Sequence, residues 1–133
     1  MTHPGPLNTT HARPVQRAPQ RRFVLLLLGS FSPLDLASAI SALEAANARL
    51  GGAPYGWRIL SESGEMLRAA NGIAVAPDGG LDPTARDDTV IVLGGDKPEQ
   101  DCSPAVLSWL RGAARQGCAI AGVSGGTWTL ARS

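Results

Sequence analysis

The chain of 133 residues is poor in several residue types, and each scarcity excludes a class of protein. It has only two cysteines, Cys102 and Cys118, which cannot form the several disulfides that hold a small secreted scaffold together. No metal-ligand spacing surrounds them, so we expect neither a zinc module nor any other metal site. The longest clean apolar run, residues 23–28, is far shorter than the roughly 20 residues of a membrane span. A membrane protein is therefore excluded as well.

Charge is also scarce, and it is unevenly placed. The net charge is +1, yet residues 1–22 carry four arginines and no acid, which leaves residues 23–133 with a net charge of −3. A folded part with this balance lacks the basic surface that grips phosphates, which argues against nucleic-acid binding by that part alone. The content of 44% hydrophobic and 17% charged residues is typical of a globular chain, and the 5% of aromatics predicts a mainly aliphatic core.

Residues 1–22 differ from the rest of the chain. They contain four prolines, both histidines and few apolar residues, which predicts a disordered, solubilising leader. Arg21 and Arg22 before the first apolar run resemble a twin-arginine export signal. That run is too short for an export signal, however, and Pro33 and Asp35 interrupt the segment that such a signal keeps apolar. We therefore expect a cytoplasmic protein.

From residue 23 onward, strand signals alternate with helix signals. Apolar runs typical of buried parallel strands cover 23–28, 89–93 and 118–123, an alternating strand covers 57–60, helices begin after Ser32 and Ser103, and Asn71-Gly72 predicts a hairpin between 65–70 and 73–76. This alternation predicts a layered α/β fold with a mainly parallel sheet. The last predicted helix, 127–132, is short for covering a sheet, so the chain has the pattern of the front part of a larger domain.

Three turns at the carboxyl ends of the predicted parallel strands are the candidate ligand site. The residues concerned are Gly29, Ser30, Phe31 and Asp35 after the first strand, Gly94, Gly95 and Asp96 after the middle strand, and Ser124, Gly125 and Gly126 after the last strand. Because the carboxyl ends of parallel strands lie at one edge of a sheet, we expect these turns to converge on one crevice.

The last of these turns, residues 122–126, fits the pattern G-x-S-x-G of a nucleophile elbow. Such a turn projects Ser124 above the sheet at the start of a helix, where free backbone N–H groups favour anions. A serine nucleophile needs a base, and His3 and His11 both lie in the leader. We therefore predict no catalytic residue.

The same residues also have structural explanations. A tight turn requires small residues, which accounts for Ser124 and its glycines, and Asp35 complements the dipole of a first helical turn. Trp128 follows Ser124 by four residues on the same helix face, and with Phe31 it would floor a pocket for a cationic ligand, although such aromatics are more often core residues.

Four segments, 23–47, 57–81, 89–95 and 117–132, resemble the N-terminal domain of GlxA-type transcriptional regulators. These regulators join a PfpI/ThiJ-like domain, within the class I glutamine amidotransferase-like superfamily, to an AraC-type helix-turn-helix region. The most specific matches begin at Gly29 and Asn71 and include the elbow at Ser124. The resemblance implies a three-layer, flavodoxin-like domain over 23–133, incomplete at its C-terminus and with the helix-turn-helix domain absent.

The resemblance also implies roles for single residues. Ser124 stands where catalytic superfamily members place a nucleophilic cysteine, Asp35 matches the acid that contacts that thiol, and Gly94-Gly95 matches the turn whose N–H lies beside it. A cysteine at a helix N-terminus can become a thiolate, whereas serine stays a neutral hydroxyl. The implied protein is a cofactor-free, non-catalytic sensor of a small metabolite such as a zwitterionic amine, acting as a homodimer and reaching DNA only through the absent domain. The alternatives are a superfamily enzyme of amidase, hydratase or deglycase type that uses Ser124, or a truncated remnant.

Overall fold

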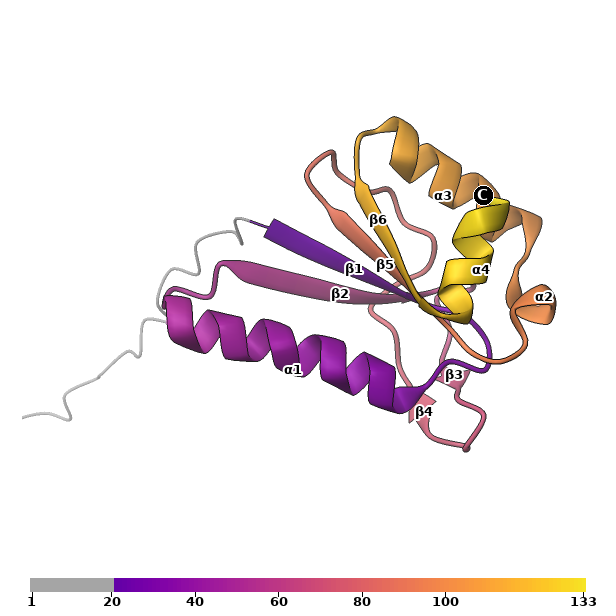
Figure 1. The fold of residues 1–133 in the computed structure, drawn as a ribbon, viewed down its shortest axis with the longest axis horizontal. Coiled ribbons are helices and arrows are strands. Elements are labelled where there is room, and N and C mark those ends of the chain that lie inside the picture. The colour runs from indigo at the N-terminus through magenta and orange to yellow at the C-terminus, as the bar shows by residue number, and fades with distance from the viewer. Residues whose placement is uncertain (1–20) are drawn as a thin grey trace, which may run out of the picture.

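The computed structural model describes residues 21–133, which form a four-stranded sheet flanked by helices (Figure 1). The strands are β1 (Arg21–Leu27), β2 (Tyr55–Ser61), β5 (Thr89–Gly94) and β6 (Ala119–Ser124). They lie in the order β2-β1-β5-β6, and every neighbouring pair is parallel. The predicted parallel α/β fold is confirmed. Within the described residues, no helix has the length and apolar character needed to cross a membrane.

Helices cover the sheet on both faces. Helix α1 (Pro33–Leu50) lies on one face, and α3 (Pro104–Arg115) and α4 (Gly125–Arg132) lie on the other (Figure 1). Successive side chains of β1 point to opposite faces of the sheet. Leu25 and Leu27 therefore belong to the apolar cluster that includes α1, while Leu26 belongs to the cluster that includes α3. These three leucines are at most 1% exposed. The core is therefore aliphatic and split into two halves by the sheet.

Both long helices begin as the sequence predicts. Ser32 caps α1 by accepting the N–H of Asp35 at 3.4 Å, and Ser103 caps α3 by accepting the N–H of Val106 at 3.2 Å. A proline occupies the first turn in each case, where its missing N–H is not needed. Helix α1 stops at Gly51, whose φ of 69° ends the helical path.

The predicted hairpin is present but shorter than expected. Strands β3 (Leu67–Arg68) and β4 (Ala74–Val75) pair antiparallel around the turn at Asn71 and Gly72. The structure also contains a one-turn helix that the sequence pattern does not predict, α2 (Pro98–Asp101). Helix α4 begins at Gly125 rather than at the predicted residue 127.

The predicted leader, residues 1–22, extends two residues too far into the chain. Arg21 and Arg22 are the first residues of β1, and the guanidinium of Arg22 binds the buried carboxylate of Asp88 through Nε at 3.0 Å and through Nη2. The remainder of the leader, with both histidines, lies outside the described residues.

Asp88 is a buried acid with several hydrogen bonds. Its carboxylate also accepts the N–H of Ala85 at 2.8 Å. Burial by itself raises the pKa of Asp88, but the hydrogen bonds from Arg22 and Ala85 outweigh it and leave the pKa below the ordinary value of 3.8. The hydrogen bond to Asp88 raises the pKa of Arg22 in turn. The pair fastens the amino end of β1 to the loop before β5.

Candidate functional site

The turns after β1, β5 and β6 meet at the carboxyl edge of the sheet, and their backbones pack closely. A methyl group on Gly95 would lie 1.7 Å from the carbonyl oxygen of Ser30, and one on Gly125 would lie 2.0 Å from the carbonyl oxygen of Gly95. No side chain fits in either place, so glycine is required at both positions for the turns to approach one another.

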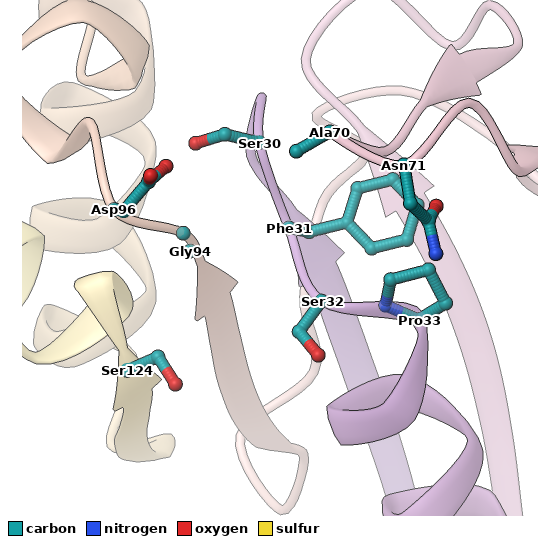
Figure 2. Close-up of a pocket in the computed structure, with 10 residues that line it drawn as sticks. Ser30, Phe31, Ser32, Pro33, Ala70, Asn71, Gly94, Asp96 and Ser124 are labelled. Atoms are coloured by element: carbon teal, nitrogen blue, oxygen red, sulfur yellow. The ribbon is translucent and has the colours of Figure 1, made fainter.

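A cavity of about 470 Å³ opens beside these turns (Figure 2). Its lining comes from four segments: residues 30–33 where β1 leads into α1, Ala70 and Asn71 in the hairpin, residues 94–96 at the end of β5, and Ser124 at the end of β6. Figure 2 shows Phe31, Pro33 and Asn71 on one side of the opening and Gly94, Asp96 and Ser124 on the other. A cavity between strand ends, with mixed apolar and polar walls, is typical of a small-molecule site in an α/β protein.

Ser124 has the backbone of an elbow residue. Its φ of 52° and ψ of −126° lie where non-glycine residues are rare, and such a conformation costs about 1–3 kcal/mol. The turn directs the side chain toward the first turn of α1, where Oγ of Ser124 donates a 2.9 Å hydrogen bond to Oδ2 of Asp35. Because α4 begins at the next residue, its free N–H groups start beside this hydroxyl.

The charge around the cavity is negative. Asp96 lines it and Asp35 reaches it through Ser124, while no lysine or arginine is among its described lining residues. Positive potential at this edge comes from the N-termini of α1 and α4, which both begin beside the cavity. The arrangement therefore offers two carboxylates for a cation and backbone donors for an anion.

Within residues 21–133, the titratable side chain that lines this cavity is Asp96. Neither cysteine lines it, and Cys118 is a buried strand-end thiol that donates to the carbonyl of Ala85 at 3.1 Å. Among residues 21–133, no group of three or more histidine, cysteine, aspartate or glutamate side chains has the arrangement of a metal site. The Ser124 hydroxyl donates to a carboxylate, and a carboxylate is a weaker general base than the histidine imidazole that commonly activates a serine nucleophile.

Some of the residues predicted for the site line the cavity, and others lie next to it. Phe31, Gly94, Gly95 and Ser124 line the cavity, Asp35 is one hydrogen bond away, and Gly125 forms the backbone behind it.

The aromatic floor expected from Phe31 and Trp128 is not formed. Trp128 is not among the lining residues, and the guanidinium of Arg132 lies 4.8 Å from the centre of its ring. Phe31 lines the cavity but is only 1% exposed, because its ring packs in the core cluster beneath α1. The cation–π partner of Trp128 is thus a residue of its own helix.

Four lining residues lie outside the predicted turns: Ser32 and Pro33, which the sequence marks only as a helix start, and Ala70 and Asn71. Ser30 and Asp96, which belong to the predicted turns, also line the cavity. Ala70 and Asn71 carried only a turn signal, because nothing local in the sequence tells that the hairpin folds toward the cavity.

Comparison with curated proteins places the chain beside transcriptional regulators from Pseudomonas aeruginosa. It is 36% identical over 111 residues to the HTH-type transcriptional regulator CdhR, a match that covers 84% of this chain and 33% of the relative. It is 37% identical over 120 residues to the HTH-type transcriptional regulator GbdR, which covers 90% of this chain and 32% of the relative. The chain thus spans about a third of the length of these relatives. No protein-family model matches it.

Solved structures agree with this result. An AraC family transcriptional regulator from Pseudomonas putida superposes with a TM-score of 0.66 at 26% identity, over 84% of this chain and 60% of that one. A ThiJ/PfpI domain protein from Brachyspira murdochii gives 0.65 at 14% identity, over 86% and 64%, which shows the fold alone. The resemblance to transcriptional regulators with a PfpI-like domain is confirmed, and so is the flavodoxin-like fold.

Proposed function

We propose that this chain is a non-catalytic, ligand-sensing part of a cytoplasmic transcriptional regulator. Its effector is a small metabolite that carries an amine or ammonium group together with an anionic group. The chain acts as a homodimer, and occupancy of the cavity changes the conformation of that dimer. The similarity to regulators over 84–90% of this chain supports the regulatory role.

The observation that carries the proposal is the contact between Ser124 and Asp35. The elbow presents a neutral hydroxyl whose proton is directed at Oδ2 of Asp35, 2.9 Å away, and no histidine or cysteine stands beside it in the described residues. This geometry keeps the shape of a reactive turn without an activated nucleophile. A strained turn beside a cavity is then best explained by binding.

The charges of the cavity support the ligand class. Asp96 and Asp35 favour a cationic group, and the free N–H groups at the start of α4 favour a carboxylate or another anion. A zwitterion satisfies both at once, whereas a doubly negative ligand would face two carboxylates.

Two small probes test this assignment without the natural effector. Tetramethylammonium stands for the cationic half of the ligand and acetate for the anionic half, each titrated into isotope-labelled protein and followed by NMR. We expect Asp35→Asn to weaken tetramethylammonium binding by about tenfold, since a charged contact is worth roughly 1.5 kcal/mol. Glu44→Gln is the matched control, because Glu44 is an exposed acid on the same helix and does not line the cavity. Equal effects of the two substitutions would contradict the assignment.

The strained elbow favours one second candidate, an enzyme of the amidase, hydratase or deglycase type. Turnover of an amide, ester or glycated substrate that disappears in Ser124→Ala would establish it. Saturable probe binding without turnover supports the sensor, and a chain that binds nothing and turns over nothing supports a remnant.

We propose that DNA is recognised by a helix-turn-helix region, which lies in the part of the relatives that this chain does not match. Residues 21–133 carry 10 basic and 11 acidic residues, a net charge of −1, so the α/β part lacks the basic excess that binds phosphates. In an electrophoretic mobility assay at low salt, we expect no retardation of duplex DNA by residues 21–133 of this chain.

A further inference from the structure

One wall of the cavity is hydrogen-bonded to a carboxylate that lies outside it. Oγ of Ser30, which lines the cavity, donates a 2.6 Å hydrogen bond to Oδ2 of Asp101. Asp101 is the last residue of α2 and faces a separate cavity of about 490 Å³. The two residues are 71 positions apart, so this bond joins the turn after β1 to the segment after β5.

The backbone of Ser30 determines the shape of this wall. Its φ of 54° is in the left-handed region, which disfavours residues with a Cβ. The carbonyl oxygen of Ser30 fills the space where a side chain of Gly95 would be. If Ser30 relaxed to a negative φ, its carbonyl would swing, and the part of the wall made by Ser30 and Gly95 would change with it.

The carboxylate of Asp101 is fitted to this turn at two successive residues. Besides accepting the Ser30 hydroxyl, its Oδ1 occupies the space beside Gly29, where a methyl group would lie only 2.4 Å from it. Figure 2 shows the Ser30 hydroxyl directed away from Phe31 and Asn71, so it is turned out of the apolar side of the cavity. A short hydrogen bond to a carboxylate is among the stronger kinds in proteins.

We propose that Asp101 is a positioning residue for the ligand site. It holds Ser30 in the left-handed conformation and thereby preorganises the wall that Ser30 and Gly95 present to a ligand. This inference rests on the proposed function of the cavity. It also predicts reciprocity: a ligand that contacts Ser30 strengthens the attachment of α2, which has no buried residue and no side-chain cap of its own.

The test compares substitutions that remove the Ser30–Asp101 hydrogen bond with a control substitution that removes one negative charge and leaves this bond in place. Asp101→Ala and Ser30→Ala each remove it. Glu62→Gln is the control, because Glu62 lines the same outer cavity as Asp101 and likewise accepts a 2.6 Å hydrogen bond from a serine, Ser103. We expect Asp101→Ala and Ser30→Ala each to weaken the binding of both acetate and tetramethylammonium by about tenfold, with Glu62→Gln within twofold of the unsubstituted protein.

The two probes separate positioning from charge. Loss of a negative charge alone weakens binding of the cation and strengthens binding of the anion, whereas loss of the preorganised wall weakens both. An Asp101→Ala effect of opposite sign on the two probes would overturn the proposal. Asp101→Asn keeps the shape and one acceptor oxygen, so it tests the same point with an intermediate loss if the alanine variant folds poorly.

Double substitution gives a second, independent readout. Asp101→Ala combined with Ser30→Ala should bind no more weakly than either single variant, because both remove the same bond. Ser30→Gly should recover much of the affinity, since glycine adopts φ near 54° without strain. Additive losses, or no recovery with glycine, would contradict a positioning role.

The positioning role of Asp101 can be tested even if the cavity binds no ligand. If the unsubstituted protein binds neither probe, the ligand-binding proposal fails, and the positioning role is judged from the unliganded protein. Asp101→Ala and Ser30→Ala should then shift the backbone amide resonances of Phe31 and Gly95 in the same way, and Glu62→Gln should leave them in place. Unmoved resonances in Asp101→Ala would overturn it.

Discussion

Replacing Asp88 with alanine removes the acid that holds the start of β1. The side chain of Asp88 is 5% exposed, and its carboxylate accepts hydrogen bonds from Arg22 and from the N–H of Ala85. A hydrogen bond involving a charged group contributes about 1.5–3 kcal/mol, and leaving the Ala85 N–H unpaired adds roughly 1 kcal/mol or more. Arg22 is 34% exposed and regains part of its hydration. We therefore expect Asp88→Ala to lower the free energy of unfolding by about 2–4 kcal/mol.

The assay is urea unfolding followed by tryptophan fluorescence near neutral pH, with Asp82→Ala as the control. Asp82 also pairs with an arginine, Arg58, at 3.0 Å, but the two side chains are 43% and 35% exposed. Exposed pairs contribute about 0–1 kcal/mol, so the control should change little. Equal effects of the two substitutions would refute the reasoning from burial.

The pH dependence of the same pair has a definite sign. Because the pKa of Asp88 is lower in the folded protein than its ordinary value of 3.8, the carboxylate stabilises the fold above that value. This stabilisation is lost as the pH falls through the lower, folded-state pKa. The difference in stability between the unsubstituted protein and Asp88→Ala should therefore be constant between about pH 5 and pH 8 and shrink in stronger acid. A difference that grew on acidification would contradict the assignment.

Two further substitutions test the turns. Gly95→Ala places a methyl group 1.7 Å from the carbonyl of Ser30 and should destabilise the protein by about 2 kcal/mol or more in thermal unfolding, whereas Gly112→Ala on α3, with no atom within 4 Å, should stabilise it by about 0.5–1 kcal/mol; equal shifts in melting temperature would contradict the close approach. Ser124→Gly removes the strain of a φ of 52° and should be about 1 kcal/mol more stable than Ser124→Ala, which also lacks the hydroxyl but keeps a Cβ at this φ, while both should weaken tetramethylammonium binding because the hydroxyl that orients Asp35 is lost; equal stability of the two variants would show that the turn is not strained.

Most of the sheet could be predicted because its signals are local. Strands β1, β5 and β6 are continuous apolar runs, since both faces of a parallel sheet are buried, and two of the helices are marked by a Ser-Pro start at residues 32–33 and 103–104. Helix α2 has no such signal in the sequence. Lys97 stands at its N-cap and makes no side-chain capping bond, and the helix has no buried residue that would give it an apolar face. Arg22 was assigned to the leader because its partner, Asp88, is 66 residues away.

The site was only partly predictable for the same reason. Strand ends of a parallel sheet meet at one edge, so Gly94, Gly95 and Ser124 follow from topology. The position of the hairpin that brings Asn71 to the cavity depends on tertiary packing. The stacking of Arg132 on Trp128 follows the i, i+4 spacing of a helix and could have been predicted from it.

The proposal that the cavity at Ser124 binds a small zwitterion can be tested directly. Its most direct test is a map of backbone amide shifts when tetramethylammonium and acetate are added together to isotope-labelled protein. We expect saturable shifts confined to the turns at residues 30–33, 70–72, 94–96 and 124–126, with those shifts reduced in Asp35→Asn. Shifts elsewhere on the surface, or none at concentrations that saturate other small-molecule sites, would contradict it.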